Sequence, residues 1–208
     1  MNNSTTARQH PAAFRPPRTE GRVGRVWTWI RRCRHCRGFG VQSPSAYHFI
    51  RYVVNEHYPY YAYTPLRRQF VAVRGSDRRL MQLYLRLANH LQADTAIDLS
   101  PLHPSAFRAY VQAGCHRTQV VNSPDSIAPI RLLRLGQPVD EAQLQSLLAQ
   151  TDSNSVVVVE HIGRHPAMRQ LWQRLVGDPR VSVSYDLHYC GIAFFDGERY
   201  KQNYIVSF

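Results

Sequence analysis

Two side chains that could carry out acid–base chemistry follow the most apolar run of the chain. Residues 156–159 are four consecutive valines, and Glu160 and His161 come directly after them. A short β-branched run of this kind predicts a buried central strand, because it is too short for a buried helix. Open α/β sheets bind ligands outside the carboxyl ends of their strands, so we expect this carboxylate and imidazole where catalysis would take place.

Of the two candidate catalytic residues, His161 is the stronger base. Its ordinary pKa lies near neutral pH, so it could deprotonate an acceptor, while Glu160 could position one. The alternative is a histidine that only ends the strand, and the residue types alone favour this alternative slightly.

The elements around this strand predict an α/β architecture. Apolar side chains at helical spacing predict a helix over residues 166–176, whose first residue, Pro166, suits a helix start. Alternating or continuous apolar residues predict strands at 95–99, 118–121, 130–135, 181–185 and 191–195. Further helices are expected from Tyr47, after a turn at Ser43-Pro44, to near His57, at 80–91 with Asp77 as its N-cap, at 105–113 and at 140–150.

Several short motifs between residues 38 and 208 resemble those of a known family. The matching residues are Gly38-Phe39-Gly40-Val41-Gln42-Ser43-Pro44, Tyr60-Tyr61-Ala62-Tyr63, Glu160-His161-Ile162, Asp186-Leu187, Gly191 and Phe194-Phe195. In this order they resemble short bacterial proteins of the class I S-adenosylmethionine-dependent methyltransferase superfamily. The resemblance implies a Rossmann-like three-layer sheet, mostly parallel with an antiparallel C-terminal edge. It also implies S-adenosylmethionine as cofactor; no metal is expected. Six strands are expected, with one strand–helix unit lost between residues 136 and 155.

The turn after the first strand departs from the pattern of this family. Relatives carry an acid, then a glycine, then a second glycine four residues later; here these positions hold Asp98, Ser100 and Pro104. A Cβ at Ser100 is costly where the backbone needs a positive φ, and Pro101 and Pro104 remove two N–H donors. We therefore expect a divergent methyltransferase-like protein with a degenerate cofactor loop, weak or absent cofactor binding and an unknown methyl acceptor.

The second strand ends without the acid that binds ribose hydroxyls in such sites. Asn122 stands there, and its amide can still form a hydrogen bond but not a charge-assisted one. The resemblance thus implies Asp98, Ser100 and Asn122 as residues near the cofactor.

Positive charge concentrates at the N-terminus. The formal net charge is +12, and residues 1–40 hold nine arginines against one glutamate, a balance of +8. Guanidinium groups suit bidentate contacts with phosphate, although a genome that favours arginine codons would leave the same bias. An alternative function is therefore a non-catalytic methyltransferase-like module whose Arg-rich N-terminus binds RNA or another acidic partner.

Three divisions of the chain are expected. Residues 1–21 are polar and predict a disordered basic tail, 22–93 a helical N-terminal cap, and 94–208 the Rossmann-like domain. Within the cap, residues 23–30 predict a basic amphipathic helix, which lies either on its own domain, as we favour, or on an anionic surface. Tyrosines 58, 60, 61 and 63 could stack on bases, but we favour their packing between the cap and the sheet.

The cysteines and the hydropathy bear on metal binding and location. Cys33 and Cys36 have the spacing of half a zinc site, but no second pair follows, so we expect two ordinary thiols. No apolar run reaches the roughly 18 residues of a membrane span, and the N-terminus has no apolar signal core. These features favour a cytoplasmic protein with reduced thiols; oligomeric state is left open.

Overall fold

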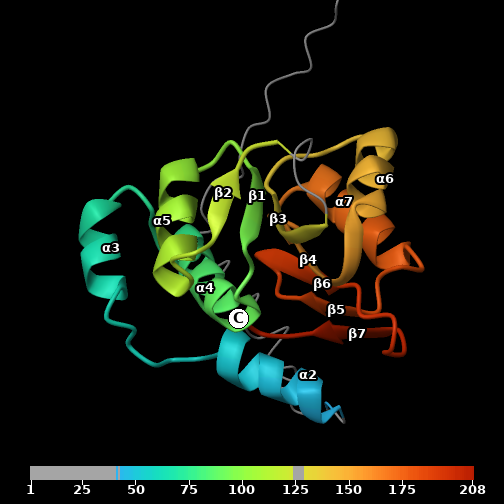
Figure 1. Cartoon of the computed structure of the whole chain (residues 1–208), viewed down its shortest axis with the longest axis horizontal. Coiled ribbons are helices and arrows are strands. Elements are labelled where there is room, and N and C mark those ends of the chain that lie inside the picture. The colour runs from blue at the N-terminus through green and yellow to red at the C-terminus, as the bar shows by residue number, and fades with distance from the viewer. Residues whose placement is uncertain (1–40, 42, 124–128) are drawn as a thin grey trace, which may run out of the picture.

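The structure is a computed structural model that describes residue 41, residues 43–123 and residues 129–208 (Figure 1). The predicted tail at 1–21, the predicted basic helix at 23–30 and the pair Cys33 and Cys36 lie outside the described residues.

A seven-stranded mixed sheet forms the centre of the described chain, in the order β2-β1-β3-β4-β6-β5-β7. Its strands are β1 (Thr95–Leu99), β2 (Gln119–Val121), β3 (Ile130–Leu135), β4 (Thr151–Glu160), β5 (Val183–Asp186), β6 (Cys190–Phe194) and β7 (Gln202–Ile205). Only β6 runs antiparallel to its neighbours, β4 and β5, and every other pairing is parallel. The predicted mostly parallel α/β sheet with an antiparallel C-terminal part is confirmed. The expected count of six strands is wrong, because the polar, largely exposed β7 completes the sheet.

Helices cover both faces of the sheet and make three layers. They are α2 (Pro44–Phe49), the π-helix η2 (Ile50–Val54), α3 (Tyr63–Gln69), α4 (Gly75–Leu91), α5 (Pro104–Gly114), α6 (Glu141–Ala149) and α7 (Pro166–Gly177). One apolar core joins α2, η2, α4 and α5 to the sheet, and a second joins α6 and α7 to the other face. Figure 1 shows these two helical layers on opposite sides of the strands.

Local sequence signals account for most helix boundaries. Asp140 caps α6 in a capping box with Gln143, and Pro104 occupies the first turn of α5. The predicted N-cap of α4 is wrong. The N-cap is Arg74, and Gly75 follows with a φ of 59°, so that Asp77 lies inside the first turn.

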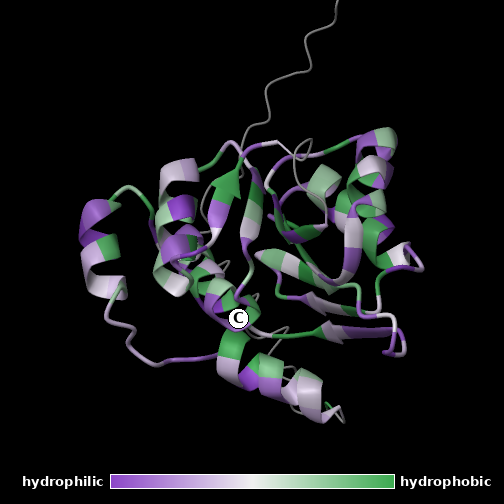
Figure 2. Ribbon diagram, in the orientation of Figure 1, coloured by the Kyte–Doolittle hydropathy of each residue, from purple (hydrophilic) through white to green (hydrophobic). Residues whose placement is uncertain are grey.

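The cap contains a helix that the sequence did not predict. The short helix α3 carries two arginines and appears largely hydrophilic in Figure 2, so it lacks the apolar stripe on which helix prediction depends. The tyrosines beside it divide into two groups. Tyr60 and Tyr63 pack against the core as expected, but Tyr58 and Tyr61 are 76% and 100% exposed, so for these two the expectation of packing is wrong.

Within the described ranges, no helix has the length and apolar character needed to cross a membrane.

Candidate functional site

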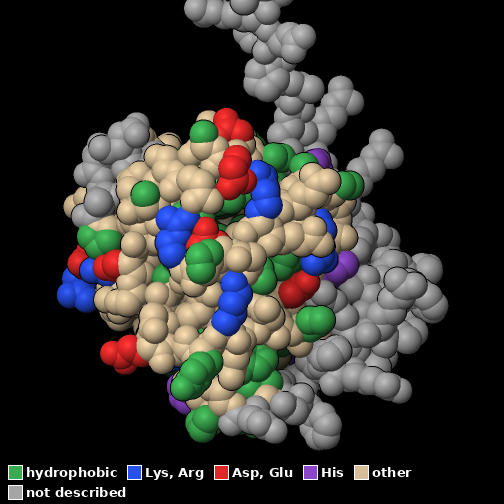
Figure 3. Space-filling view, turned by 90° about the vertical axis from the view of Figure 1, so that its right-hand side faces the viewer, with side chains coloured by type: hydrophobic (Ala, Val, Ile, Leu, Met, Phe, Trp, Pro, Cys, Tyr) green, Lys and Arg blue, Asp and Glu red, His purple; other side chains and the backbone are tan. Residues whose placement is uncertain are grey.

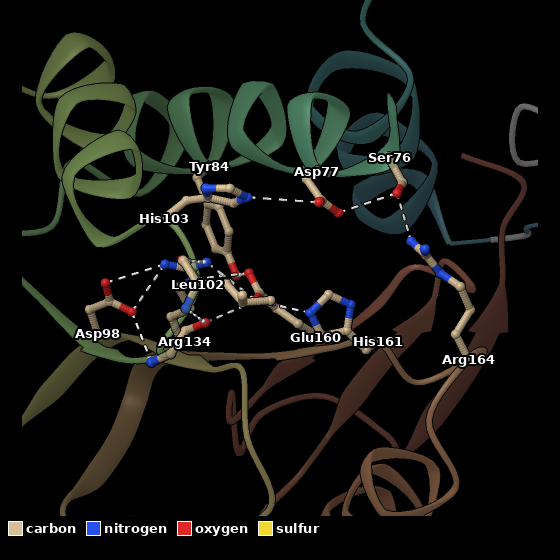
Figure 4. Close-up of polar contacts among 11 residues, drawn as sticks. Ser76, Asp77, Tyr84, Asp98, Leu102, His103, Arg134, Glu160, His161 and Arg164 are labelled. Carbon is tan, nitrogen blue, oxygen red and sulfur yellow. Dashed lines mark hydrogen bonds and ion pairs between the residues drawn. The ribbon is translucent and has the colours of Figure 1, made fainter. Parts of the chain in front are cut away.

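The carboxyl ends of three neighbouring parallel strands bring charged side chains together. In the sheet register Asp98 of β1 is paired with Arg134 of β3, and Arg134 is paired with Val158 of β4. Glu160 lies two residues beyond Val158, so its side chain leaves the strand on the same face as that of Arg134. Asp98, Arg134 and Glu160 therefore meet at one edge of the sheet, under helix α4 (Figure 4).

Arg134 uses every part of its guanidinium group. Nε donates to Glu160 Oε1 at 2.8 Å, Nη1 to both oxygens of Asp98 at 3.2 Å, and Nη2 to the carbonyl of Leu102 at 2.7 Å and to Glu160 Oε2 at 3.3 Å. The side chains of Arg134, Asp98 and Glu160 are each 1% exposed. The guanidinium carbon also lies 4.8 Å from the centre of the Phe107 ring. Full pairing of this kind is what a buried charge requires.

Two hydroxyl groups complete the coordination of Glu160. Tyr84 donates from α4 to Oε1 at 2.9 Å, and Ser100 Oγ donates to Oε2 at 3.3 Å. The Ser100 backbone N–H donates to Asp98 at 3.0 Å. We call Tyr84, Asp98, Ser100, Arg134 and Glu160 the arginine cluster.

The arginine cluster shifts the pKa values of its two carboxyl groups in opposite directions. Burial alone would raise the pKa of Glu160, but the charge and hydrogen bonds of Arg134 hold that pKa below its ordinary value. Burial raises the pKa of Asp98, which shares the same guanidinium through longer contacts. Glu160 is thus an ionised hydrogen-bond acceptor held by its neighbours, and in this state it is not available as a general base.

His161 lies beside the cluster in a constrained backbone conformation. Its Nε2 is 3.7 Å from Glu160 Oε2, and its side chain is 5% exposed. Burial lowers its pKa, more than the nearby Glu160 raises it, so the imidazole is neutral. Its φ of 60° is uncommon for a residue other than glycine, and His103 and His188 share this feature with φ values of 52° and 70°.

Side chains from α4 close the outer side of this edge. Asp77 Oδ2 lies 3.9 Å from His103 Nε2, and Ser76 Oγ accepts a hydrogen bond from Arg164 Nη2 at 2.6 Å. Arg164 also lies over the ring of Tyr189, with its guanidinium carbon 4.9 Å from the ring centre. The first turn of α4 is thereby tied to the loops that follow β1 and β4 (Figure 4).

Four of the five predicted site residues, Asp98, Ser100, Glu160 and His161, are in direct contact with one another or with the cluster at this edge. Asn122 follows β2, whose parallel pairing of Val121 with Ile97 brings it to the same edge beside β1, and there it lines a hollow of about 510 Å³ with Pro104 and Arg108. The turn after β1 is packed closely. A Cβ built on Gly136, which follows β3, would lie 1.9 Å from Ser100 Oγ and 2.9 Å from Glu160 Oε2.

Sequence reasoning missed the central residue, Arg134. The signal was present, because an arginine inside the apolar run of residues 130–135 must either face solvent or find buried partners. Tyr84 was also missed, since it falls on the apolar stripe of its helix, where a tyrosine is indistinguishable from a packing residue.

In the described ranges, no group of three or more histidine, cysteine, aspartate or glutamate side chains is arranged to hold a metal ion. No known protein family matches this sequence, and no curated protein matches it significantly.

Proposed function

We propose that this protein is a non-catalytic module that uses a Rossmann-like sheet as a scaffold and binds RNA through its Arg-rich N-terminal segment. The observation that carries the non-catalytic part is the arginine cluster. At the sheet edge where α/β proteins bind ligands, Arg134 engages both carboxylates, Asp98 and Glu160, that were predicted to serve a cofactor and an acceptor. Because the guanidinium and the two carboxylates already form hydrogen bonds with one another, they have few free donors or acceptors for a ligand.

The resemblance to S-adenosylmethionine-dependent methyltransferases is consistent with this proposal. The seven-stranded mixed sheet is the kind of architecture that the resemblance implies. The loop of residues 100–104 is held by the bond from Arg134 to the Leu102 carbonyl, and it lacks the two glycines of the family pattern. The proposal therefore keeps the scaffold of that superfamily without its reaction.

The distribution of charge supports an acidic polymer as the partner. Residues 1–40 hold +8 of the formal +12, and on the face shown in Figure 3 the positive and negative side chains of the described residues are interspersed. Arginine neutralises phosphates and releases their counterions, which gives sequence-independent affinity. Tyr58 and Tyr61 of the cap are exposed, and rings of this kind stack on unpaired bases.

The partner is tested by the salt dependence of RNA binding. A fluorescent single-stranded RNA should bind the full chain with an affinity that falls steeply with salt. The logarithm of the association constant should fall by about 0.7 per phosphate contact for each tenfold increase in salt concentration. Deleting residues 1–20 removes Arg8, Arg15 and Arg18, and should reduce the slope by up to about 2. Replacing Arg174 of α7 and Arg180, which follows this helix, by glutamine is the control and should leave the slope unchanged. An unchanged affinity and slope in the deletion would exclude the tail as the contact surface.

The absence of catalysis is tested separately by calorimetric titration with S-adenosylmethionine and S-adenosylhomocysteine. We expect weak or no binding, because each missing interaction costs about 1 kcal/mol or more. A sub-micromolar dissociation constant for either compound would refute the non-catalytic proposal while leaving the RNA result intact.

One observation favours the second candidate, a divergent S-adenosylmethionine-dependent methyltransferase. His161 is neutral and stands at the carboxyl end of β4, which is the protonation state and the place that a general base needs. In that case His161→Gln would abolish methyl transfer to the acceptor and leave cofactor affinity unchanged.

A further inference from the structure

The end of the sheet that faces away from the arginine cluster contains a hollow of about 430 Å³. Its walls come from α2, the last turn of α4, the first half of β4, the strands β5 and β6, and the turn after β6. A volume of this size lies in the range of small-molecule sites. We refer to it as the α2–α4 hollow.

The floor of the α2–α4 hollow is aromatic. Phe49 of α2, Tyr185 of β5 and Phe194 of β6 line it, and their ring centres are mutually 4.8 to 5.9 Å apart. Phe49 and Tyr185 are almost completely buried and hold the floor in place by packing, while Phe194 is half-buried and is the most accessible of the three rings. A prearranged floor of three rings favours a flat, apolar ligand group.

The rim of the hollow is polar, and among the described residues that line it two histidines are the basic groups outside an ion pair. Arg199 Nε and Asp196 Oδ2 form an ion pair at 2.7 Å, so these two charges offset each other. His48 of α2 and His90 of α4 also line the hollow, and both are exposed. A rim with a neutralised ion pair and two imidazoles is complementary to an anionic ligand group.

We infer that the α2–α4 hollow binds a small aromatic acid, with its ring on the Phe49, Tyr185 and Phe194 floor and its carboxylate facing His48 and His90. This site is independent of the RNA-binding function proposed above.

Binding of such an acid is coupled to proton uptake. His90 is exposed at the surface but its ring lies against that of Phe49, and this partial desolvation, together with the neighbouring His48, lowers the pKa of His90 in the unliganded protein. The other titratable or charged groups that line the hollow are Tyr185, Asp196 and Arg199. A carboxylate bound beside His90 favours the protonated form of this residue, so affinity for the acid increases as pH falls toward the ordinary pKa of histidine.

Isothermal titration of the full chain with 2-naphthoate tests this inference, and the uncharged 2-naphthylmethanol serves as the charge control. The acid should bind several-fold more tightly at about pH 6 than at about pH 7.5, because its binding takes up a proton. Uptake of at most one proton limits the change in affinity to about tenfold per pH unit. The alcohol should bind more weakly, with no dependence on pH.

Two variants separate the histidines from the aromatic floor. His48→Gln with His90→Gln should reduce the affinity for 2-naphthoate to that for the alcohol and remove the pH dependence. Phe194→Leu should weaken both compounds. His57→Gln with His116→Gln, two exposed histidines outside the lining of the hollow, is the matched control and should behave like the wild type.

Absence of 2-naphthoate binding at millimolar concentration would overturn the inference. So would binding of 2-naphthoate that survives unchanged in the double histidine variant, or an alcohol that binds as tightly as the acid.

Discussion

The two ends of the sheet are built on opposite principles. At the carboxyl ends of β1, β3 and β4 the protein fills the space with its own ionised groups, each of which has partners within the fold. At the other end, aromatic rings and histidines of the described residues line a hollow. The comparison teaches that the position where an α/β sheet usually binds its ligand can become part of the core, while an unrelated position retains the properties of a binding site.

The largest effect should follow from removing the guanidinium at the filled end. Arg134→Met leaves Asp98 and Glu160 buried without a counter-charge and should lower the free energy of unfolding by about 3–5 kcal/mol. Urea denaturation followed by circular dichroism measures this. Adding Asp98→Asn and Glu160→Gln should recover part of the loss, because the uncompensated charges are then removed.

Arg131→Met provides the control for this measurement. Arg131 pairs with Asp152 at 2.7 Å, but the two side chains are 32% and 35% exposed. Partly exposed pairs contribute up to about 1 kcal/mol, so this variant should change stability much less. Equal losses in the two variants would show that burial of the arginine cluster has no special energetic role.

A smaller loss should follow from filling the close contact beneath Ser100. Gly136→Ala places a methyl group on the Ser100 hydroxyl and should cost about 1–3 kcal/mol. Ser100→Gly in the same chain should restore much of the stability, since it removes the clashing atoms. Gly177→Ala is the matched control, because a Cβ there meets nothing within 4 Å. Independent, additive effects of the two substitutions would contradict the close packing of this turn.

His161 should contribute to the pH dependence of stability. Burial lowers the pKa of His161, so below about pH 6.5 the unfolded chain takes up a proton that the folded protein does not. The free energy of unfolding therefore decreases as the pH is lowered. His161→Asn, which tolerates a positive φ, should make this decline between pH 7 and 5.5 shallower by about 1 kcal/mol or less. The exposed His57→Asn is the control. A slope identical to that of the wild type would mean that other groups cause the decline.

The smallest effect is expected at the open end of the sheet. His90 is exposed and contacts the ring of Phe49, with ring centres 5.6 Å apart. His90→Gln should therefore change the free energy of unfolding by no more than about 0.5 kcal/mol. A loss of several kcal/mol in the same urea experiment would show that the rim is a structural element and not an open binding surface.

Sequence reasoning succeeded where one local pattern decides the structure. The valines before Glu160, the stripe of α4 and the leucines of α6 each predict an element through an apolar run or through periodicity. It placed Asp98, Ser100, Glu160 and His161 at one edge, because parallel strands end together.

Other features depend on contacts between distant segments. The partners of Arg134 lie 36 and 26 residues away in the sequence, so no local pattern identifies them. Asn122 was predicted at the site because it follows a strand, and the pairing of β2 with β1 brings it to the same edge, where it lines a hollow with Pro104 and Arg108. The polar β7 joins the sheet through backbone pairing with β5, which leaves little trace in hydropathy.

The buried ion cluster also has a consequence for how the protein opens. Separating any one of β1, β3 and β4 from the others would leave at least one charge without its partner in an apolar interior, at a cost of several kcal/mol. Partial opening of a single strand is therefore disfavoured relative to release of all three. Amide hydrogens along these strands should exchange with solvent at a common free energy, as one cooperative unit, while the polar edge strand β7 exchanges earlier and on its own.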